Sequence, residues 1–283
     1  MSDPGAAAAD FRRAAELNRH DLLRTGSLLE FPDYGQLVVT GDLHGHRRNF
    51  EKIRRYAQLD RRPHRHVILQ ELIHAESSEV QRDLSGELLL EAVRWQLAFP
   101  EQVHFLQSNH ELAQLLGGGI TKNGRSALEL FDHGLAASFG TEAPAVREAI
   151  GEFIASLPLA ARTATRIFCS HSLPNAREMG SFDPHCVRRT HTVEQMGKGT
   201  DPYRLVWGRR FTREQLDRLT DAWDVAVFIV GHQPQPRGWS ADLDRVLTIG
   251  SDTNHGVLVA MDLSRFYDLD ALSGNIIPLA GIE

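Results

Sequence analysis

Residues 38–50, VVTGDLHGHRRNF, join an apolar run to a cluster of polar residues. The run is typical of a buried strand, and it ends in Gly41-Asp42-Leu43-His44-Gly45-His46, after which the charge pattern becomes helical. In an extended chain, residues two apart point to the same side, so Asp42 and His44 can both reach one ion. Glycines on either side let the backbone turn sharply and approach a ligand closely. The stretch therefore predicts a metal site with oxygen and nitrogen ligands.

Other apolar runs alternate with amphipathic segments along the chain. The runs that we expect to be strands lie at 66–73, 102–107, 164–170 and 225–231. The expected helices lie at 7–24, 47–59, 80–99 and 212–223. Up to residue 107 this alternation predicts a largely parallel or mixed sheet covered by helices. We also expect a hairpin around Pro32–Gly35 and paired strands within 244–263.

Each expected strand is followed by side chains that can ligate a metal. The residues in these positions are Asp42 and His44, Glu71 and His74, Asn109 and His110, His171, and His232. Ligand sites in such folds gather at the carboxyl ends of the strands, so we expect these side chains to lie close together.

The blocks GDLHGH (41–46), SNHE (108–111), SH (170–171) and VGH (230–232), in this order, resemble the calcineurin-like metallophosphoesterases. Within that superfamily the closer similarity is to the Ser/Thr-type phosphoprotein phosphatases and their bacterial relatives. The resemblance implies an α/β fold, a mixed β-sheet sandwich flanked by helices. We expect a single domain over 1–283, with a core at about 27–112 and 162–283 and a helical insert at about 113–160.

The resemblance also assigns roles to individual residues. It implies Asp42 and His44 as ligands of a first metal, and Asn109, His171 and His232 as ligands of a second. The two ions would be divalent, with Mn²⁺ expected first and Fe or Zn as alternatives. His110 matches the general acid that protonates the leaving oxygen, and Arg209 or Arg210 matches an arginine that contacts the phosphate.

The second block of the family, GDxxDRG, is altered in this chain, which reads Gln70-Glu71-Leu72-Ile73-His74-Ala75-Glu76. Glu71 stands where the family has the aspartate that bridges the two metals; it either bridges them in turn or is an ordinary acid at a strand end. His74 replaces the aspartate that orients the general acid, and it either hydrogen-bonds to His110 or adds a ligand. His255 follows a late strand and is a further candidate to line the cleft.

Composition limits the classes of molecule that this protein is expected to bind and the cellular compartment in which it is expected. The chain has 31 Lys+Arg against 37 Asp+Glu, a net charge of −6, which argues against a generic nucleic-acid binder. No apolar run approaches the roughly 20 residues that span a bilayer. The N-terminal residues lack the pattern of a secretory signal, and the two cysteines cannot form a disulfide framework. We therefore expect a cytoplasmic protein with neither nucleic acid nor membrane as a partner.

The resulting hypothesis is a metal-dependent phosphoric ester hydrolase, a phosphatase. Two ions would generate a hydroxide that attacks phosphorus in line, and His110 would protonate the departing oxygen. The resemblance suggests phosphoserine or phosphothreonine in proteins as the substrate. One alternative is hydrolysis of a dinucleoside polyphosphate or another small phosphoester. A second alternative, of another class, is a module that binds metal or a partner protein but has lost turnover.

Overall fold

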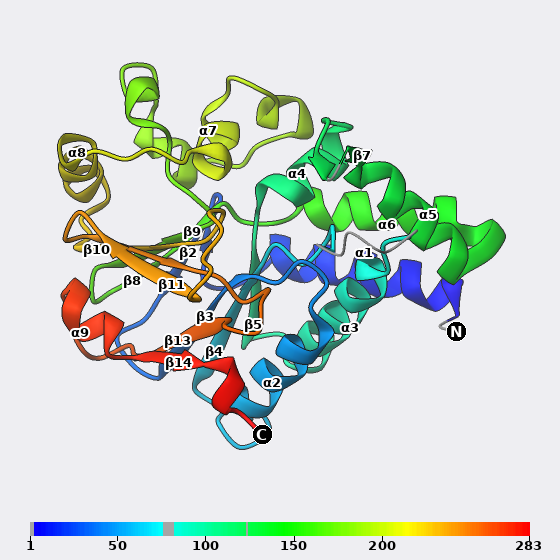
Figure 1. The fold of residues 1–283 in the computed structure, drawn as a ribbon, viewed down its shortest axis with the longest axis horizontal. Helices are drawn as coiled ribbons and strands as arrows, with labels where there is room; N and C mark the ends of the chain where they lie inside the picture. The colour runs from blue at the N-terminus through cyan, green and yellow to red at the C-terminus, as the bar shows by residue number, and fades with distance from the viewer. Residues whose placement is uncertain (1–2, 76–81, 123) are drawn as a thin grey trace.

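Two large β-sheets pack face to face in the computed structural model, and helices cover both outer faces (Figure 1). The structure describes residues 3–75, 82–122 and 124–283. The order of layers is therefore helix, sheet, sheet, helix, which confirms the predicted mixed sandwich flanked by helices.

The first sheet has the strand order β14-β13-β3-β4-β5. Its strands are β3 (Gln36–Asp42), β4 (Arg65–Gln70), β5 (Val103–Leu106), β13 (Val257–Asp262) and β14 (Ile276–Pro278). The neighbours β3, β4 and β5 are parallel, whereas β13 runs antiparallel to both β3 and β14.

The second sheet has the strand order β1-β2-β8-β9-β10-β12-β11. Its strands are β1 (Arg24–Thr25), β2 (Leu28–Phe31), β8 (Ala160–Thr163), β9 (Ile167–Ser170), β10 (Val227–Val230), β11 (Trp239–Asp242) and β12 (Val246–Ile249). The central strands β9, β10 and β12 are parallel. Alternation along β10 explains the burial of both faces: Val227 and Ile229 pack between the sheets, and Phe228 and Val230 pack under the helices.

The helices form one layer on each sheet. The first sheet is covered by α1 (Pro4–Arg19), α2 (Arg47–Ala57), α3 (Ser85–Ala98), α5 (Ala127–Phe139) and α6 (Ala143–Ala155). The second is covered by α7 (Asp201–Trp207) and α8 (Arg213–Trp223). The remaining elements are α4 (Asn109–Leu116), α9 (Leu269–Ser273), the hairpin β6 (Thr121–Lys122) and β7 (Arg125–Ser126), and the 3₁₀ turns η1 (Gly140–Glu142), η2 (Ala176–Glu178), η3 (Pro184–Arg188), η4 (Val193–Met196) and η5 (Leu279–Gly281). None of the helices in the described ranges combines the length and apolar character needed to cross a lipid bilayer.

Two of the expected pairings are wrong. β2 and β3 flank the turn at Pro32–Gly35 but belong to different sheets, and so do β12 and β13. Turn residues mark where the chain changes direction, and they do not specify which strand the next run will join. Both connections instead carry the chain from one sheet to the other.

Two helices are shorter than expected. α1 ends at Arg19, and Leu22, which lies within the helix expected at 7–24, is 93% exposed. α3 begins at Ser85, because Asp83 accepts hydrogen bonds from the backbone N–H groups of Ala75 and Ser85 in the preceding turn. Residues 80 and 81, the start of the expected helix, lie outside the described residues.

The two sheets meet at the carboxyl ends of their parallel strands. Asp42 at the end of β3 forms a parallel bridge with Gly250, just beyond β12, and the N–H of Ser251 donates to the Asp42 carbonyl at 2.9 Å. A Cβ on Gly41 would lie 2.1 Å from the carbonyl oxygen of Ile249. Only glycine therefore permits this approach, which brings the polar strand ends of both sheets to one place.

Candidate metal centre

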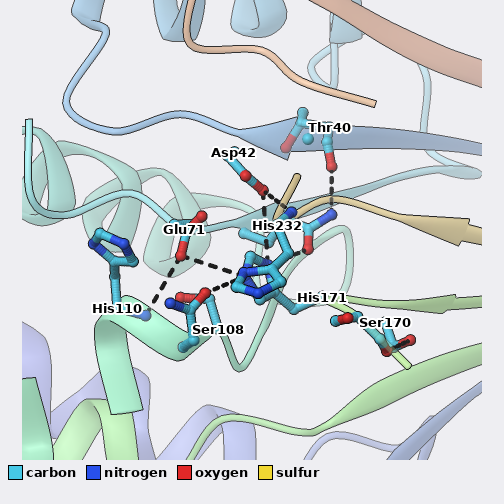
Figure 2. A network of polar contacts seen from close by, with 12 residues as sticks. Thr40, Asp42, Glu71, Ser108, His110, Ser170, His171 and His232 are labelled. Carbon is cyan, nitrogen blue, oxygen red and sulfur yellow. Dashed lines mark hydrogen bonds and ion pairs between the residues drawn. The ribbon is translucent and has the colours of Figure 1, made fainter. Parts of the chain in front are cut away.

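The strand ends surround a cavity of about 360 Å³. The sequence-predicted residues that line it are Asp42, His44, Glu71, Asn109, His110, Arg209 and His232. His171, the remaining predicted ligand, lies fully buried behind Asn109, with 2.6 Å between its Nε2 and the Asn109 Oδ1. Figure 2 shows Asp42, Glu71, His171 and His232 converging from different strands of the two sheets. The predicted clustering of strand ends is thus present.

Glu71 lies at the centre of the cluster. Its Oε2 is 3.3 Å from Nε2 of His44, and its Oε1 is 3.3 Å from Nε2 of His171. Two buried groups of potential ligands share it: Asp42, Glu71 and His171, and His44, Glu71 and His110. Within each group the ligand atoms lie within 4.8 Å of one another. A carboxylate common to two such groups is the arrangement that a bridging ligand requires.

The candidate histidine ligands are oriented by hydrogen bonds behind them. Nδ1 of His44 is 3.0 Å from the carbonyl oxygen of Ile73, so it must donate there. Nδ1 of His171 is 3.1 Å from Oε1 of Gln70, whose own amide donates to the Thr40 carbonyl at 2.8 Å. Both rings therefore present the lone pair of Nε2 to the cluster. Metal-binding histidines are ordinarily held in this way.

The charges in the cluster depend on one another. Burial raises the pKa of Asp42 well above its ordinary value, and the neighbouring Glu71 raises it further. Burial acts on Glu71 in the same direction, but the imidazoles of His171, His110 and His44 outweigh it and hold the pKa of Glu71 well below its ordinary value. Two carboxylates this close and this buried require positive charge nearby.

The His232 ring carries no charge that would repel a cation. Burial and the neighbouring His171 lower the pKa of His232 to about 3, so its ring is neutral at neutral pH. Its Nε2 accepts a hydrogen bond of 3.0 Å from Nε of Arg209, and its backbone N–H donates to Oδ1 of Asp42 at 3.0 Å. With imidazoles, an amide oxygen and two carboxylates, the donor set fits a pair of divalent ions such as Mn²⁺, Fe²⁺ or Zn²⁺.

Several of these residues have left-handed backbone conformations, which are uncommon outside glycine. The φ angles are 42° at His44, 47° at Glu71, 61° at His74 and 67° at His232. Such conformations cost on the order of 1–3 kcal/mol each and persist only where the surrounding structure holds them. They gather at functional sites, and here they turn each side chain at the end of its strand toward the cluster.

Glu111 fixes the altered second block against α4. The Ser108 side chain caps α4 by accepting from the N–H of Glu111 at 3.3 Å, and it also donates to the Glu111 carboxylate. The other carboxylate oxygen accepts from the N–H groups of Leu72 at 2.7 Å and Ile73 at 3.3 Å. The loop that carries Glu71 and His74 is therefore held next to the helix that carries His110.

His74 lies against His110. The two Nδ1 atoms are 3.0 Å apart, and Nε2 of His74 is 2.9 Å from Oε1 of Gln114. His110 lines the cavity, whereas His74 is 1% exposed and belongs to neither group of potential ligands found among the described residues. Of the two roles considered for His74, this geometry matches the hydrogen bond to His110.

Two predicted residues lie elsewhere. Arg210 and His255 are exposed and are not among the described residues that line the cavity; the backbone N–H of Arg210 donates to Asn175 at 3.2 Å. Of the two candidate arginines, the structure brings Arg209 to the site.

Other residues of the site were not anticipated from the sequence. Trp207 and Asp252 line the cavity, and Gln114 contacts His74 behind it. The signal for Gln114 is its spacing, because it lies four residues after His110 and so on the same face of α4. Trp207 and Asp252 carry no comparable signal, since Trp207 ends α7 and Asp252 lies in the loop after β12.

Solved structures resemble the whole chain. A protein serine/threonine phosphatase from Saccharomyces cerevisiae, with similarity to human phosphatase PP5, superimposes with a TM-score of 0.72 at 14% identity, over 99% of this chain and 94% of that one. A cold-active protein-tyrosine phosphatase of a psychrophilic Shewanella species superimposes with a TM-score of 0.59 at 14% identity, over 93% of this chain and 84% of that one. No family model and no curated protein matches the sequence. The fold of this chain is therefore similar to that of a serine/threonine phosphatase, the type of protein that the sequence resembles.

Proposed function

We propose that this protein is a phosphomonoesterase that uses two divalent metal ions, with phosphoserine or phosphothreonine in proteins as its substrate. The observation that carries the proposal is Glu71, whose carboxylate lies in the cavity lining 3.3 Å from Nε2 of His44 and 3.3 Å from Nε2 of His171. The phosphatase fold of the structural neighbours supports it. Mn²⁺ is the ion that we propose first. The cytoplasm is the compartment that we propose, since both cysteines are free thiols.

Each residue of the centre has a task in this reaction. Asp42, His44, Glu71, Asn109, His171 and His232 would hold the ions. When bound, the ions supply a hydroxide nucleophile and neutralise charge on the phosphoryl oxygens. Arg209 would donate to the phosphate from the wall of the cavity, and His110 would give a proton to the departing oxygen.

The size of the cavity bears on the substrate. At about 360 Å³ it is near the lower end of the range for small-molecule sites. That volume favours a phosphorylated side chain reaching in from a protein surface. Trp207 in the cavity wall is the feature that favours the alternative, a dinucleoside polyphosphate or another small phosphoester, because an indole can stack on a base.

The first experiment is hydrolysis of p-nitrophenyl phosphate by metal-stripped protein, with and without added Mn²⁺, with Asp42→Asn as the control. Turnover that depends on Mn²⁺ and is lost in D42N supports the proposal. Phosphopeptides and a dinucleoside tetraphosphate, tested next under the same conditions, separate the two substrate classes by kcat/KM.

A second variant tests whether the protein is a binding module without turnover. His110→Ala should abolish hydrolysis while calorimetry still detects Mn²⁺, because His110 acts on the leaving oxygen. Absence of Mn²⁺-dependent turnover in the unmodified protein, with Mn²⁺ still bound, would contradict the enzymatic proposal and favour the binding module.

A further inference from the structure

A chain of hydrogen bonds runs from the surface of the helical layer to His110. Arg147 on α6 contacts Asp132 on α5, with 2.8 Å between Nε and Oδ1. The same Oδ1 lies 3.3 Å from Nε2 of Gln114 on α4. Oε1 of Gln114 then contacts Nε2 of His74 at 2.9 Å, and His74 contacts His110 at 3.0 Å. The chain thus links an ion pair at the surface to the proposed general acid.

The chain has a fixed direction. The Asp132 carboxylate only accepts hydrogen bonds, so Gln114 must turn its NH₂ group toward it. The Gln114 oxygen therefore faces His74, and Nε2 of His74 must carry a hydrogen. In its neutral form the His74 ring has a single N–H, so its Nδ1 is then an acceptor. His110 must then donate from its own Nδ1.

We infer that Gln114, oriented by Asp132, is a positioning residue that makes His74 an acceptor for His110 and so directs Nε2 of His110 to the reacting oxygen. The opposite amide orientation would set the Gln114 oxygen against the Asp132 carboxylate, two acceptors facing each other. The opposite tautomer of His74 would point an N–H at the Nδ1 of His110. A protonated His110 carries a hydrogen on that nitrogen and would then have no acceptor for it.

The position of Gln114 suits this task. It is 6% exposed and lies one helical turn after His110, so the two side chains flank His74. In the resembled family an aspartate orients the acid histidine, and an aspartate needs no such partner because it can only accept. A histidine in that place can either donate or accept, so a further group is needed to fix which of its two ring nitrogens carries the hydrogen.

The tautomer itself can be measured without turnover. Protein labelled with ¹⁵N-histidine gives long-range ¹H–¹⁵N spectra that distinguish protonated from bare ring nitrogens. In metal-free protein, above the ordinary histidine pKa, we expect hydrogen on Nε2 of His74 and on Nδ1 of His110, assigned by loss of signals in His74→Asn and His110→Asn. Gln114→Met should allow the tautomer of His74 that carries its hydrogen on Nδ1. Hydrogen on Nδ1 of His74 in the unmodified protein, or an unchanged pattern in Q114M, would overturn the inference.

Turnover gives an independent readout, which rests on the proposed function. A good leaving group such as p-nitrophenolate departs without a proton, and phenolate needs one. Gln114→Met should therefore lower kcat for phenyl phosphate by about 10–100-fold and for p-nitrophenyl phosphate by only a few fold. Gln96→Met is the matched control, since Gln96 is also buried but bonds to Asn18. Equal losses on both substrates in Q114M would contradict a positioning role.

Asp132→Ala is a second variant that tests the same inference if Q114M does not fold. Asp132 has a side chain 37% exposed, so its removal leaves the core intact. Gln114 can then take either amide orientation, and we expect a smaller change in the same direction in both readouts. If the unmodified protein hydrolyses nothing, the proposed function fails, while the spectra still decide the role of Gln114.

Discussion

Replacing Gly231 by alanine is expected to displace Asp42, a proposed metal ligand, without changing any proposed ligand itself. Gly231 lies between β10 and His232, and a Cβ built on it would be 2.2 Å from Oδ1 of Asp42 and 3.3 Å from its Cγ. Contacts of a Cβ below 3.0 Å essentially do not occur, so the Cβ and Oδ1 of Asp42 must separate by at least 0.8 Å, which is 3.0 Å minus 2.2 Å.

The Asp42 side chain has little freedom to move. Its Oδ1 accepts from the N–H of His232, and its backbone forms the bridge to Gly250 that joins the two sheets. A displacement near 1 Å at a reacting centre can cost about 100-fold in rate. Overpacking in a buried place costs about 1–3 kcal/mol. We therefore expect G231A to lower kcat/KM by about 100-fold, to weaken Mn²⁺ binding, and to lower Tm by several degrees.

The assays are hydrolysis of p-nitrophenyl phosphate with Mn²⁺, calorimetric titration of Mn²⁺ and thermal unfolding. Gly180→Ala is the matched control, because a Cβ there meets nothing within 4 Å. If G231A retained the Mn²⁺ affinity and the kcat/KM of G180A, the assignment of Asp42 as a ligand held by its neighbours would be refuted.

Three further perturbations have defined outcomes. Glu71→Asp, which restores the family's residue type, should weaken Mn²⁺ binding in calorimetry, since a side chain one methylene shorter draws back from the two histidines that Glu71 contacts at 3.3 Å each. Burial, with His104 nearby, lowers the pKa of His66 from 6.5 to about 4, so only the unfolded chain binds this proton between those pH values. The free energy of unfolding should therefore fall by up to about 3 kcal/mol as pH drops through that window, and urea titrations should show a smaller fall in His66→Gln. Burial raises the pKa of Cys169 and Cys186 each to about 12, so a thiol reagent should modify neither in the native protein and both after unfolding.

The sequence carried enough information to predict where the site would form. Polar residues after successive apolar runs, such as Asp42, Glu71 and Asn109, could be placed together because the carboxyl ends of the parallel strands β3, β4 and β5 share an edge of one sheet. That argument needs only the order of these elements. β2 carries none of the site residues, so the wrong pairing expected for β2 and β3 left the site prediction intact.

The parts that were not predicted depend on contacts between distant segments. Nothing local requires Glu71 or His74 to adopt a left-handed backbone; the N–H groups of Leu72 and Ile73, between them, donate to the carboxylate of the distant Glu111. Trp207 and Asp252 reach the cavity only because the second sheet packs against the first. His255 has the same kind of position in the sequence as the true cavity residues, yet it lies at the surface.

Three altered positions of the second block, Gln70, Glu71 and His74, have specific partners, whereas Ala75 replaces the family's phosphate-contacting arginine with no polar group. Gln70 stands where the family has glycine, and its side chain orients His171 while bonding to the Thr40 carbonyl. Glu71 replaces an aspartate, and it still contacts histidines of both ligand groups. His74 replaces a second aspartate, and Gln114 restricts it to the accepting role that an aspartate has by nature. In each case the new side chain has a specific partner whose geometry preserves the older task.

A site decaying after loss of function would have no reason to bury these polar groups with their hydrogen bonds satisfied, because an unsatisfied buried polar group costs about 1–3 kcal/mol and an apolar replacement is cheaper. The pattern of partners therefore favours a centre that still works, with its general acid held by an amide relay in place of a carboxylate.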